Sequence, residues 1–296
     1  GRLSSITDVR TRDGNMNQIH GSYSIGLLDG RFQIEGPIVK NKTSFNFGLR
    51  RSWIDLFLRP AFALINKSND DGEQYSFGYL FHDLNGKITH RFSDRSKVYL
   101  SVYSGIDRYY IHDKSIWSSF ISDTKNNFNW GNLNIALNWN YQINNKMFMN
   151  LAGVYTYNRS NHEYSEDDTE HNGVSVTRTC LDIQKNRSRI YDTGFKADFD
   201  YRPDTNNRLF FGGSYTYHIF KPQTLQQTFY YGDVGEGSDT STVNGTNFHR
   251  SHELSLYAED EWRINNRVNA DFGINYSMFS VKGKTFSRID PRIAFK

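Results

Sequence analysis

The sequence is poor in residues that several common architectures require. It contains one cysteine, Cys180, which excludes an intramolecular disulfide, and only 5 of its 296 residues are proline. It has no run of about 18 apolar residues, which excludes a membrane-spanning helix. The formal net charge is +3, and no compact basic run stands out. We therefore expect no nucleic-acid partner.

The signatures of common enzyme classes are also missing. The sequence has no Gly-x-Ser-x-Gly, no His-Glu-x-x-His, no P-loop and no dinucleotide fingerprint. We therefore expect no catalytic residues, no cofactor and no enzymatic activity. One acidic cluster offers oxygen ligands of the kind Ca²⁺ prefers, but it lacks a defined loop motif, so we expect no metal site. Its residues are Glu163, Glu166, Asp167, Asp168 and Glu170.

Aromatic residues are abundant and follow a period of two. Phe, Trp and Tyr make up 16% of the chain, although its mean hydropathy is only -0.69. From Leu133 to Ile143 the odd positions are apolar or aromatic, and the even positions are Asn, Ala or Gln. The alternation resumes at Met147 after the polar turn 144–146 and continues to Tyr157. This pattern predicts a long antiparallel hairpin with one apolar face and one polar face.

The same pattern recurs along the chain. Short polar turns fall at 40–43, 93–96, 144–146, 204–207 and 265–267, and alternating segments flank each of them. They predict twelve strands, with a bulge at Asp83-Leu84, where the alternation breaks phase. The predicted ranges are 19–28, 31–38, 44–53, 77–92, 97–111, 128–143, 147–160, 180–202, 208–221, 249–264, 267–280 and 288–296.

The remaining connections are expected to be long loops, at about 54–76, 112–127, 160–179, 222–250 and 281–287. Short turns at one end and long loops at the other are typical of a transmembrane antiparallel up-and-down β-barrel. Aromatic residues near both strand ends fit the two interfacial girdles of such a barrel. Beside the short turns they are Phe92, Tyr99, Trp139, Tyr141, Phe199, Tyr201 and Trp262, and toward the loops they are Tyr109, Tyr110, Tyr155, Tyr157, Tyr215 and Tyr217. Charged residues would then face the lumen, where they could contact a plug or simply line a solvated wall: Lys196, Asp198, Asp200, Arg202, Glu259 and Glu261.

Some predicted loops carry aromatic residues that could stack on a ligand. Packing within the loops, or contact with a surface lipoprotein, would explain the same residues. The candidates are Trp117, Phe120, Phe229, Tyr230 and Tyr231.

Five segments resemble one transporter family. Gly1–Asn15, with the sequence GRLSSITDVRTRDGN, resembles the junction between plug and barrel in TonB-dependent outer-membrane transporters. It is most similar to the Bacteroidota type, which carries a carboxypeptidase-regulatory-like domain. The segments His20–Ser22, Glu35–Ile38 and Arg50–Trp53 resemble the opening hairpins of that family, and Asp290–Phe295 resembles a mid-barrel strand.

The resemblance implies an all-β fragment of a larger protein. The family's barrel has 22 strands around a plug, so residues 1–15 would be the C-terminal tail of the plug and 16–296 the N-terminal half of the barrel. The chain opens directly on a strand-like segment without a leader, which fits a processed or truncated piece. The resemblance also implies location in the outer membrane of a Gram-negative bacterium and contact with its lipids. It implies import of a large or scarce ligand, driven by TonB through the plug.

Two alternatives stay open. The chain could be a complete twelve-stranded barrel that acts as a passive channel or as an outer-membrane enzyme, because barrels of even strand number are common. It could also be a soluble carbohydrate-binding β protein whose aromatic residues stack on sugars.

Overall fold

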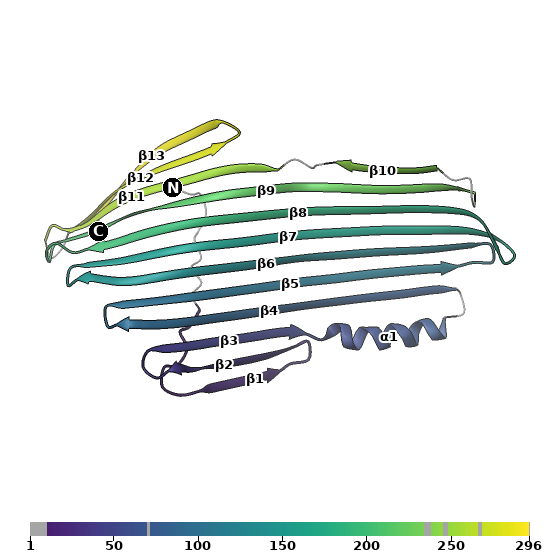
Figure 1. Cartoon of the computed structure of the whole chain (residues 1–296), viewed down its shortest axis with the longest axis horizontal. Helices are drawn as coiled ribbons and strands as arrows, with labels where there is room; N and C mark the ends of the chain where they lie inside the picture. Colours follow the sequence, from purple (N-terminus) through teal and green to yellow (C-terminus); the bar gives the residue numbers. More distant parts are fainter. Residues whose placement is uncertain (1–10, 70–71, 234–237, 245–247, 266–267, 296) are drawn as a thin grey trace.

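The computed structural model describes residues 11–69, 72–233, 238–244, 248–265 and 268–295. They form one antiparallel sheet of 13 strands, of which β1 to β9 and β11 to β13 follow one another in chain order, while β10 pairs with β9 (Figure 1). The strands are β1 (His20–Ile25), β2 (Asp29–Val39), β3 (Thr43–Ser52), β4 (Glu73–Ser93), β5 (Ser96–Ile116), β6 (Phe120–Asn144), β7 (Met147–Asn172), β8 (Ser175–Tyr201), β9 (Asn207–Asp233), β10 (Ser238–Asn244), β11 (His249–Arg263), β12 (Asn269–Val281) and β13 (Lys284–Phe295).

The all-β antiparallel fold predicted from the alternation is confirmed. The twelve strands of the continuous path correspond to the twelve predicted ones, and β10 adds a thirteenth. Within the described residues β1 and β13 do not pair with each other, so the sheet is open. None of the helices in this part of the chain is long and apolar enough to cross a membrane.

The sheet has two faces of different character. We call the face that carries residues 11–16 the inner face and the opposite one the outer face. In the β6–β7 hairpin, Leu137 pairs with Gly153 and Trp139 with Leu151 on the outer face, while Asn140 pairs with Asn150 on the inner face. Paired residues share a face, so the apolar and polar sets of the predicted hairpin fall as the period of two requires.

The strands are much longer than predicted. The stretches 112–127 and 160–179, expected to be loops, continue the ladders of β5 to β8 in unbroken pairing almost to the turns at 117–119 and 173–174. β7 has 26 residues and β8 has 27. In these stretches both faces carry polar residues, so the period-two signal disappears while the backbone hydrogen bonds continue. Sequence periodicity therefore marked only the amphipathic part of each strand.

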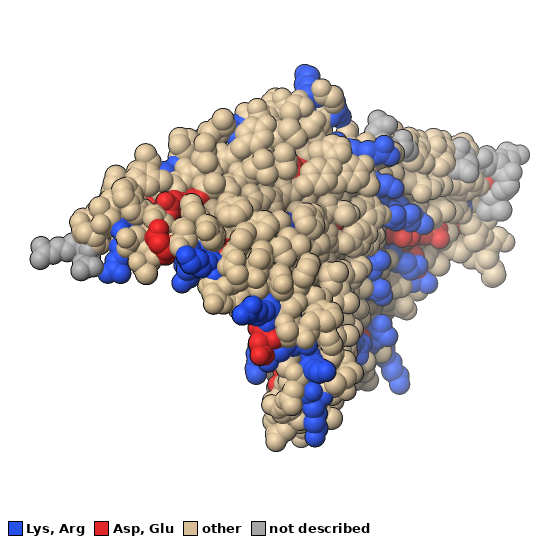
Figure 2. All heavy atoms as spheres, turned by 60° about the vertical axis from the view of Figure 1, so that its left-hand side comes forward, with Lys and Arg blue, Asp and Glu red and all other residues tan. Residues whose placement is uncertain are grey.

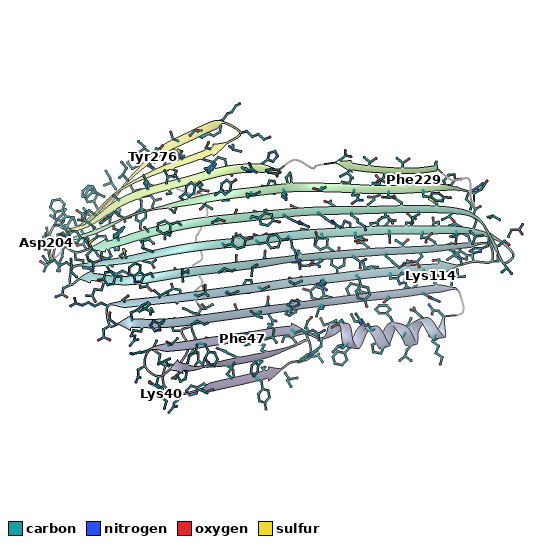
Figure 3. The ribbon with its side chains drawn as sticks, in the orientation of Figure 1. Lys40, Phe47, Lys114, Asp204, Phe229 and Tyr276 are labelled. Carbon is teal, nitrogen blue, oxygen red and sulfur yellow. The ribbon has the colours of Figure 1, made fainter. Side chains whose placement is uncertain are left out.

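Each long strand has two ends, which we name from their turns. The proximal end lies at the turns 94–95 and 145–146, and the distal end at the turns 117–119 and 173–174. Lys40 and Asp204 lie toward the proximal end in Figure 3, and Lys114 and Phe229 lie toward the distal end.

A helix replaces most of another predicted loop. Within this stretch, 54–68 form α1 (Ile54–Ser68) and 73–76 begin β4. Asp55 lies in the first turn of the helix and Lys67 in the last, where each suits the helix dipole. The pairing of β3 with β4 ends at Arg51 and His82, and α1 lies beside the rest of β4 (Figure 1). The side chain of Asn66 exchanges two hydrogen bonds with the backbone of Tyr75, at 2.8 and 2.9 Å. The helix thus covers a strand edge that would otherwise be unpaired.

The other two predicted long loops are also corrected. Residues 222–233 belong to β9, and 238–244 form β10. The stretch 281–287 is a tight hairpin whose turn residues, Lys282 and Gly283, have φ of 50° and 75°. Two positive φ values are typical of a type I′ turn, whose twist matches that of the two strands of a hairpin. The predicted turn at 265–267 lies partly outside the described residues.

The bulge predicted at Asp83-Leu84 is wrong. Pairing runs without interruption through both residues to β3 and to β5. The apparent break of phase arises because aromatic residues occupy the polar face: Tyr79 and Phe81 lie on the same face as Asp83 and Lys87. The register shifts of β4 lie at 91–93 instead.

Candidate functional site on the inner face

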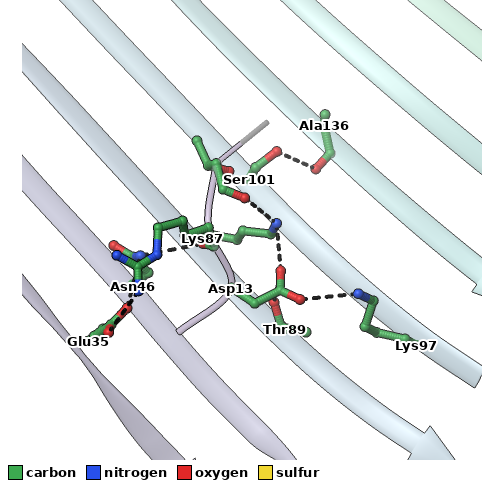
Figure 4. Close-up of polar contacts among 10 residues, drawn as sticks. Asp13, Glu35, Asn46, Lys87, Thr89, Lys97, Ser101 and Ala136 are labelled. Atoms are coloured by element: carbon green, nitrogen blue, oxygen red, sulfur yellow. Dashed lines mark hydrogen bonds and ion pairs between the residues drawn. The ribbon is translucent and has the colours of Figure 1, made fainter. Parts of the chain in front are cut away.

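Residues 11–16 cross the inner face over β3, β4 and β5 and are bound there by their own polar groups. Asp13 lies between two lysines, 2.7 Å from Lys87 Nζ on β4 and 3.1 Å from Lys97 Nζ on β5 (Figure 4). Lys87 Nζ also donates a 2.9 Å hydrogen bond to the carbonyl oxygen of Thr11. The backbone carbonyl of Arg12 accepts from Asn46 Nδ2 at 3.4 Å. Three strands therefore share in holding one short segment.

Gly14 allows this segment to approach the backbone of β3 closely. A Cβ atom at this position would lie 2.0 Å from the carbonyl oxygen of Phe45, which no real side chain tolerates. Gly14 is buried in this position. The segment is thus pressed against the sheet at Gly14 and anchored by charge at the residue before it.

Lys87 is the most deeply placed of the charges in this site. Its side chain is 9% exposed, and its ammonium lies 4.3 Å from the centre of the Tyr99 ring. A buried ammonium requires a compensating charge, which Asp13 supplies. Burial alone would raise the pKa of Asp13, but Lys87 and Lys97 outweigh that effect and hold the pKa below its usual value.

Beside the bound segment the inner face is hollowed, with a volume of about 1470 Å³. Its wall combines amide and hydroxyl side chains with almost as many charged ones, most of them cationic. Asn140 donates a 2.8 Å hydrogen bond to Asn150 across the β6–β7 pair. Residues 11–13 form part of the lining, as does Lys196 of β8. Such a wall suits water or a polar chain segment better than an apolar ligand.

The charged residues predicted to face a lumen lie together on this face. Arg208 joins two of them, with 2.7 Å to Asp200 and 3.6 Å to Glu261. Asp198 accepts from Lys196 at 2.9 Å and from the Tyr257 hydroxyl at 2.7 Å. Arg202 lies 3.7 Å from Asp200, and Glu259 occupies the same face opposite Phe210. Asp198, Asp200 and Glu261 therefore have partners on other strands, and Lys196 and Arg202 have partners within β8.

The predicted ligand-contacting aromatics are not brought together. Trp117 and Phe120 stack on each other at the distal turn of β5 and β6, with ring centroids 5.6 Å apart. Phe229 and Tyr231 lie on the inner face of β9, but Tyr230 lies on the outer face. Strands β7 and β8 separate the first pair from the second, so the five residues do not form one site.

The acidic cluster is likewise divided by the strand period. Glu166, Asp168 and Glu170 face inward, whereas Glu163 and Asp167 face outward. Burial and a hydrogen bond from its hydroxyl to Glu166 raise the pKa of Tyr164 to about 12. The described residues contain no group of three or more acids, histidines or cysteines placed to hold a metal ion.

The outer face carries an apolar band at the proximal end. On β6 it consists of six alternating residues from Leu133 to Ile143, and Leu137 is 53% exposed. A broad uncharged surface is visible in Figure 2, with Lys and Arg side chains gathered beyond it. Most aromatics expected in girdles face outward, but Tyr99 and Tyr109 face inward.

The anchoring of residues 11–16 is the part of the site that sequence reasoning missed. Lys87 stood out only as one polar residue in an alternating strand, and Asp13 only as part of a resemblance. The available signal was a lysine in the middle of an inner-face row, because a central strand position buries its charge once anything covers that face. Residues 1–10, where the last strand of the plug was expected, lie outside the described residues.

Comparison with known proteins adds little. No family model matches the chain, and no curated protein matches it. Among solved structures, the CymD monoaromatic hydrocarbon channel is 9% identical, with 94% of this chain and 85% of that chain covered and a TM-score of 0.23. The siderophore receptor PirA from Acinetobacter baumannii is 8% identical, with 94% and 74% covered and a TM-score of 0.20. TM-scores this low give neither likeness any weight.

Proposed function

We propose that this chain forms part of the wall of a plugged outer-membrane β-barrel that imports a large or scarce ligand with energy supplied through TonB. The observation that carries the proposal is the binding of residues 11–16 on the inner face by Asp13, Lys87 and Lys97. A segment held inside the wall by buried charge is what a plug requires. In a passive channel the same segment would narrow the path.

The outer face supports insertion into a membrane. Ten residue steps from Leu133 to Ile143 span roughly 33 Å at about 3.3 Å per residue. A strand tilt of about 40° reduces this to roughly 25 Å, the height of the apolar band of outer-membrane barrels. Polar residues occupy the inner face of the same strands, as expected for an aqueous interior.

The remaining parts of the proposal come from the sequence resemblance. A barrel of 22 strands would need further strands beside β1 and β13, and residues 1–15 would connect to the plug. TonB would act on that plug, and a surface lipoprotein would be a second partner at the distal end. Trp117, Phe120, Phe229 and Tyr231 stay candidates for ligand contact, and the proposed role involves no catalysis.

Two measurements on the full-length protein test the proposal. In liposomes, we expect no swelling in arabinose, because the plug closes the barrel. In detergent, we expect the protein to bind the periplasmic domain of TonB from its own organism. Swelling at the rate of a porin without TonB binding would replace the proposal with the passive channel. Solubility of the full-length protein without detergent would favour the carbohydrate-binding alternative.

A further inference from the structure

Three cationic side chains form a row on the outer face, just beyond the apolar band. Arg159 of β7 is directly opposite Arg189 of β8, and Arg189 is directly opposite Lys221 of β9. Directly opposite residues in a sheet share a face and lie about 5 Å apart at Cβ. Like charges in such positions repel each other, so the row destabilises the sheet unless an anion lies against it.

The chain itself does not supply that anion. No described residue forms an ion pair with Arg159, Arg189 or Lys221. The acid that follows on the outer face of β7, Glu163, lies two same-face positions beyond Arg159 and is paired with Lys185 at 3.3 Å. The repulsion within the row therefore remains uncompensated by the protein.

The row has a fixed relation to the apolar band. One same-face position nearer the proximal end, Tyr157 pairs with Tyr191, and their rings stack with centroids 4.8 Å apart. The ammonium of Lys221 lies 6.0 Å from the Tyr191 ring. Tyrosine side chains prefer the level of the lipid head groups. The three cations lie one same-face position further out, about 7 Å along the strand, and are therefore level with the phosphates of the head groups.

The row differs from the other cations of the outer face because its members are directly opposite one another: Arg108 of β5 is opposite Asn129, and Arg250 of β11 is opposite Ile219. The same register continues to Gly131 on β6 and Ile106 on β5, neither of which carries charge. A Cβ added to Gly131 would lie 3.6 Å from Arg159 Nε, so Arg159 extends over a position that has no side chain. General attraction to anionic lipid would not require three cations directly opposite one another, whereas the binding of one phosphorylated ligand would.

We propose that Arg159, Arg189 and Lys221 bind the phosphate groups of a phosphorylated lipid of the outer leaflet. Two guanidinium groups can each donate a pair of hydrogen bonds to a phosphate, and the ammonium adds a point charge. The acyl chains of the lipid would lie along the apolar band below Tyr157 and Tyr191. This inference depends on the membrane location of the proposed function, but not on import or on TonB.

The test compares two triple variants of the full-length protein in detergent, by native mass spectrometry with diphosphoryl lipid A as probe. R159Q/R189Q/K221Q removes the row. K114Q/K125Q/K185Q removes three cations from the same face further toward the distal end. At roughly a factor of five for each cation near a membrane surface, we expect the row variant to bind the lipid about 100-fold more weakly. The control variant should bind like the wild type.

Further arms separate the possible outcomes. Dephosphorylated lipid A should bind weakly and equally to all three proteins. R159K/R189K, which keeps the charge but loses the paired donors, should fall between wild type and the row variant. Without lipid, the row variant should be at least as stable as the wild type, because it lacks the repulsion, and this shows that it is folded. Equal loss in both triple variants, or equal binding of both lipids by the wild type, overturns the proposal. Failure to fractionate with the outer membrane would instead refute the proposed location.

Discussion

The proximal and distal halves of β6, β7 and β8 differ in the polarity of their outer faces, although each of these strands runs through both halves. In the proximal half, the outer face of β6 is apolar from Leu133 to Ile143, and the inner face is rich in Asn. In the distal half, the outer face carries Asp123, Lys125 and Asn127, and the inner face is polar too. The ladder of backbone hydrogen bonds is the same in both halves.

Because of this difference, the two halves require different surroundings to be stable. The proximal half exposes apolar side chains that only lipid or another apolar phase can cover without cost. The distal half can stand in water, held by its ladder and by ion pairs such as Lys125–Asp123 at 2.9 Å. Substitutions that place the same change in each half test whether the two halves depend on different surroundings.

An arginine on the outer face of β6 gives the largest expected contrast. Leu137→Arg places a charge in the middle of the apolar band, which costs about 2–4 kcal/mol at a bilayer midplane. Asn127→Arg makes the same addition on the same face and strand in the distal half, and it should change stability by less than about 0.5 kcal/mol. Urea unfolding of the full-length protein in phosphatidylcholine vesicles measures both. Equal losses of unfolding free energy in the two variants would mean that the outer faces of both halves contact the same kind of environment.

Removing the Asp13 carboxylate tests the inner face of the proximal half. Asp13→Asn leaves Lys87 buried without a counter-charge. Because Asp13 is 36% exposed, we expect the free energy that holds the segment on the sheet to fall by about 2 kcal/mol. This is less than the loss of roughly 3–5 kcal/mol expected when one partner of a fully buried ion pair is removed. Hydrogen exchange of the amides of residues 13–16 should become about 30-fold faster.

The second lysine provides the matched control. Lys97 contacts the same carboxylate at 3.1 Å but is 36% exposed. Lys97→Gln should therefore cost less than about 1 kcal/mol, as exposed ion pairs do. If both substitutions loosen the segment equally, burial of Lys87 is not what holds it.

Acid should weaken the same contact in a defined direction. The pKa of Asp13 is lower in the folded protein than in the unfolded chain, so the ion pairs contribute fully above the unfolded value of about 3.9. Their contribution is lost as the pH falls through the lowered pKa. Exchange at residues 13–16 should thus be protected equally at pH 7 and pH 5 and lose protection below about pH 4. Asp13→Asn should remove this dependence, and a dependence that persists in the variant would assign it to another group.

The proximal half is also the part that sequence could predict. Its apolar and polar faces alternate, so the twelve strands of the continuous path and four of the short turns followed from the pattern. The distal half could not be predicted, because 112–127 and 160–179 are polar on both faces. Helix α1 was missed because it carries Pro60 and follows β-like sequence, and it forms where β4 offers an uncovered edge.

The candidate site also has a part that the sequence could predict and a part that it could not. The faces of Lys196, Asp198 and Asp200 followed from the period of two, but their partners did not. Arg208 reaches Asp200 from the neighbouring strand, and the register that pairs them is fixed only in three dimensions. Asp13 and Lys87 are 74 positions apart in the sequence, and no local pattern connects them.

Ion pairs give the smallest expected contrast between the halves. In the proximal half Arg208 holds Asp200 through two hydrogen bonds of 2.7 and 3.1 Å, and Asp200 is 23% exposed. In the distal half Lys185 approaches Glu163 with one contact of 3.3 Å, and Glu163 is 47% exposed. Arg208→Gln should cost about 1–2 kcal/mol, because the paired geometry strengthens the charge-assisted hydrogen bonds. Lys185→Gln should cost less than about 0.5 kcal/mol, and 1 M salt should remove even that. A larger loss for Lys185→Gln in urea unfolding would show that surface charge, and not the backbone ladder, stabilises the distal strands.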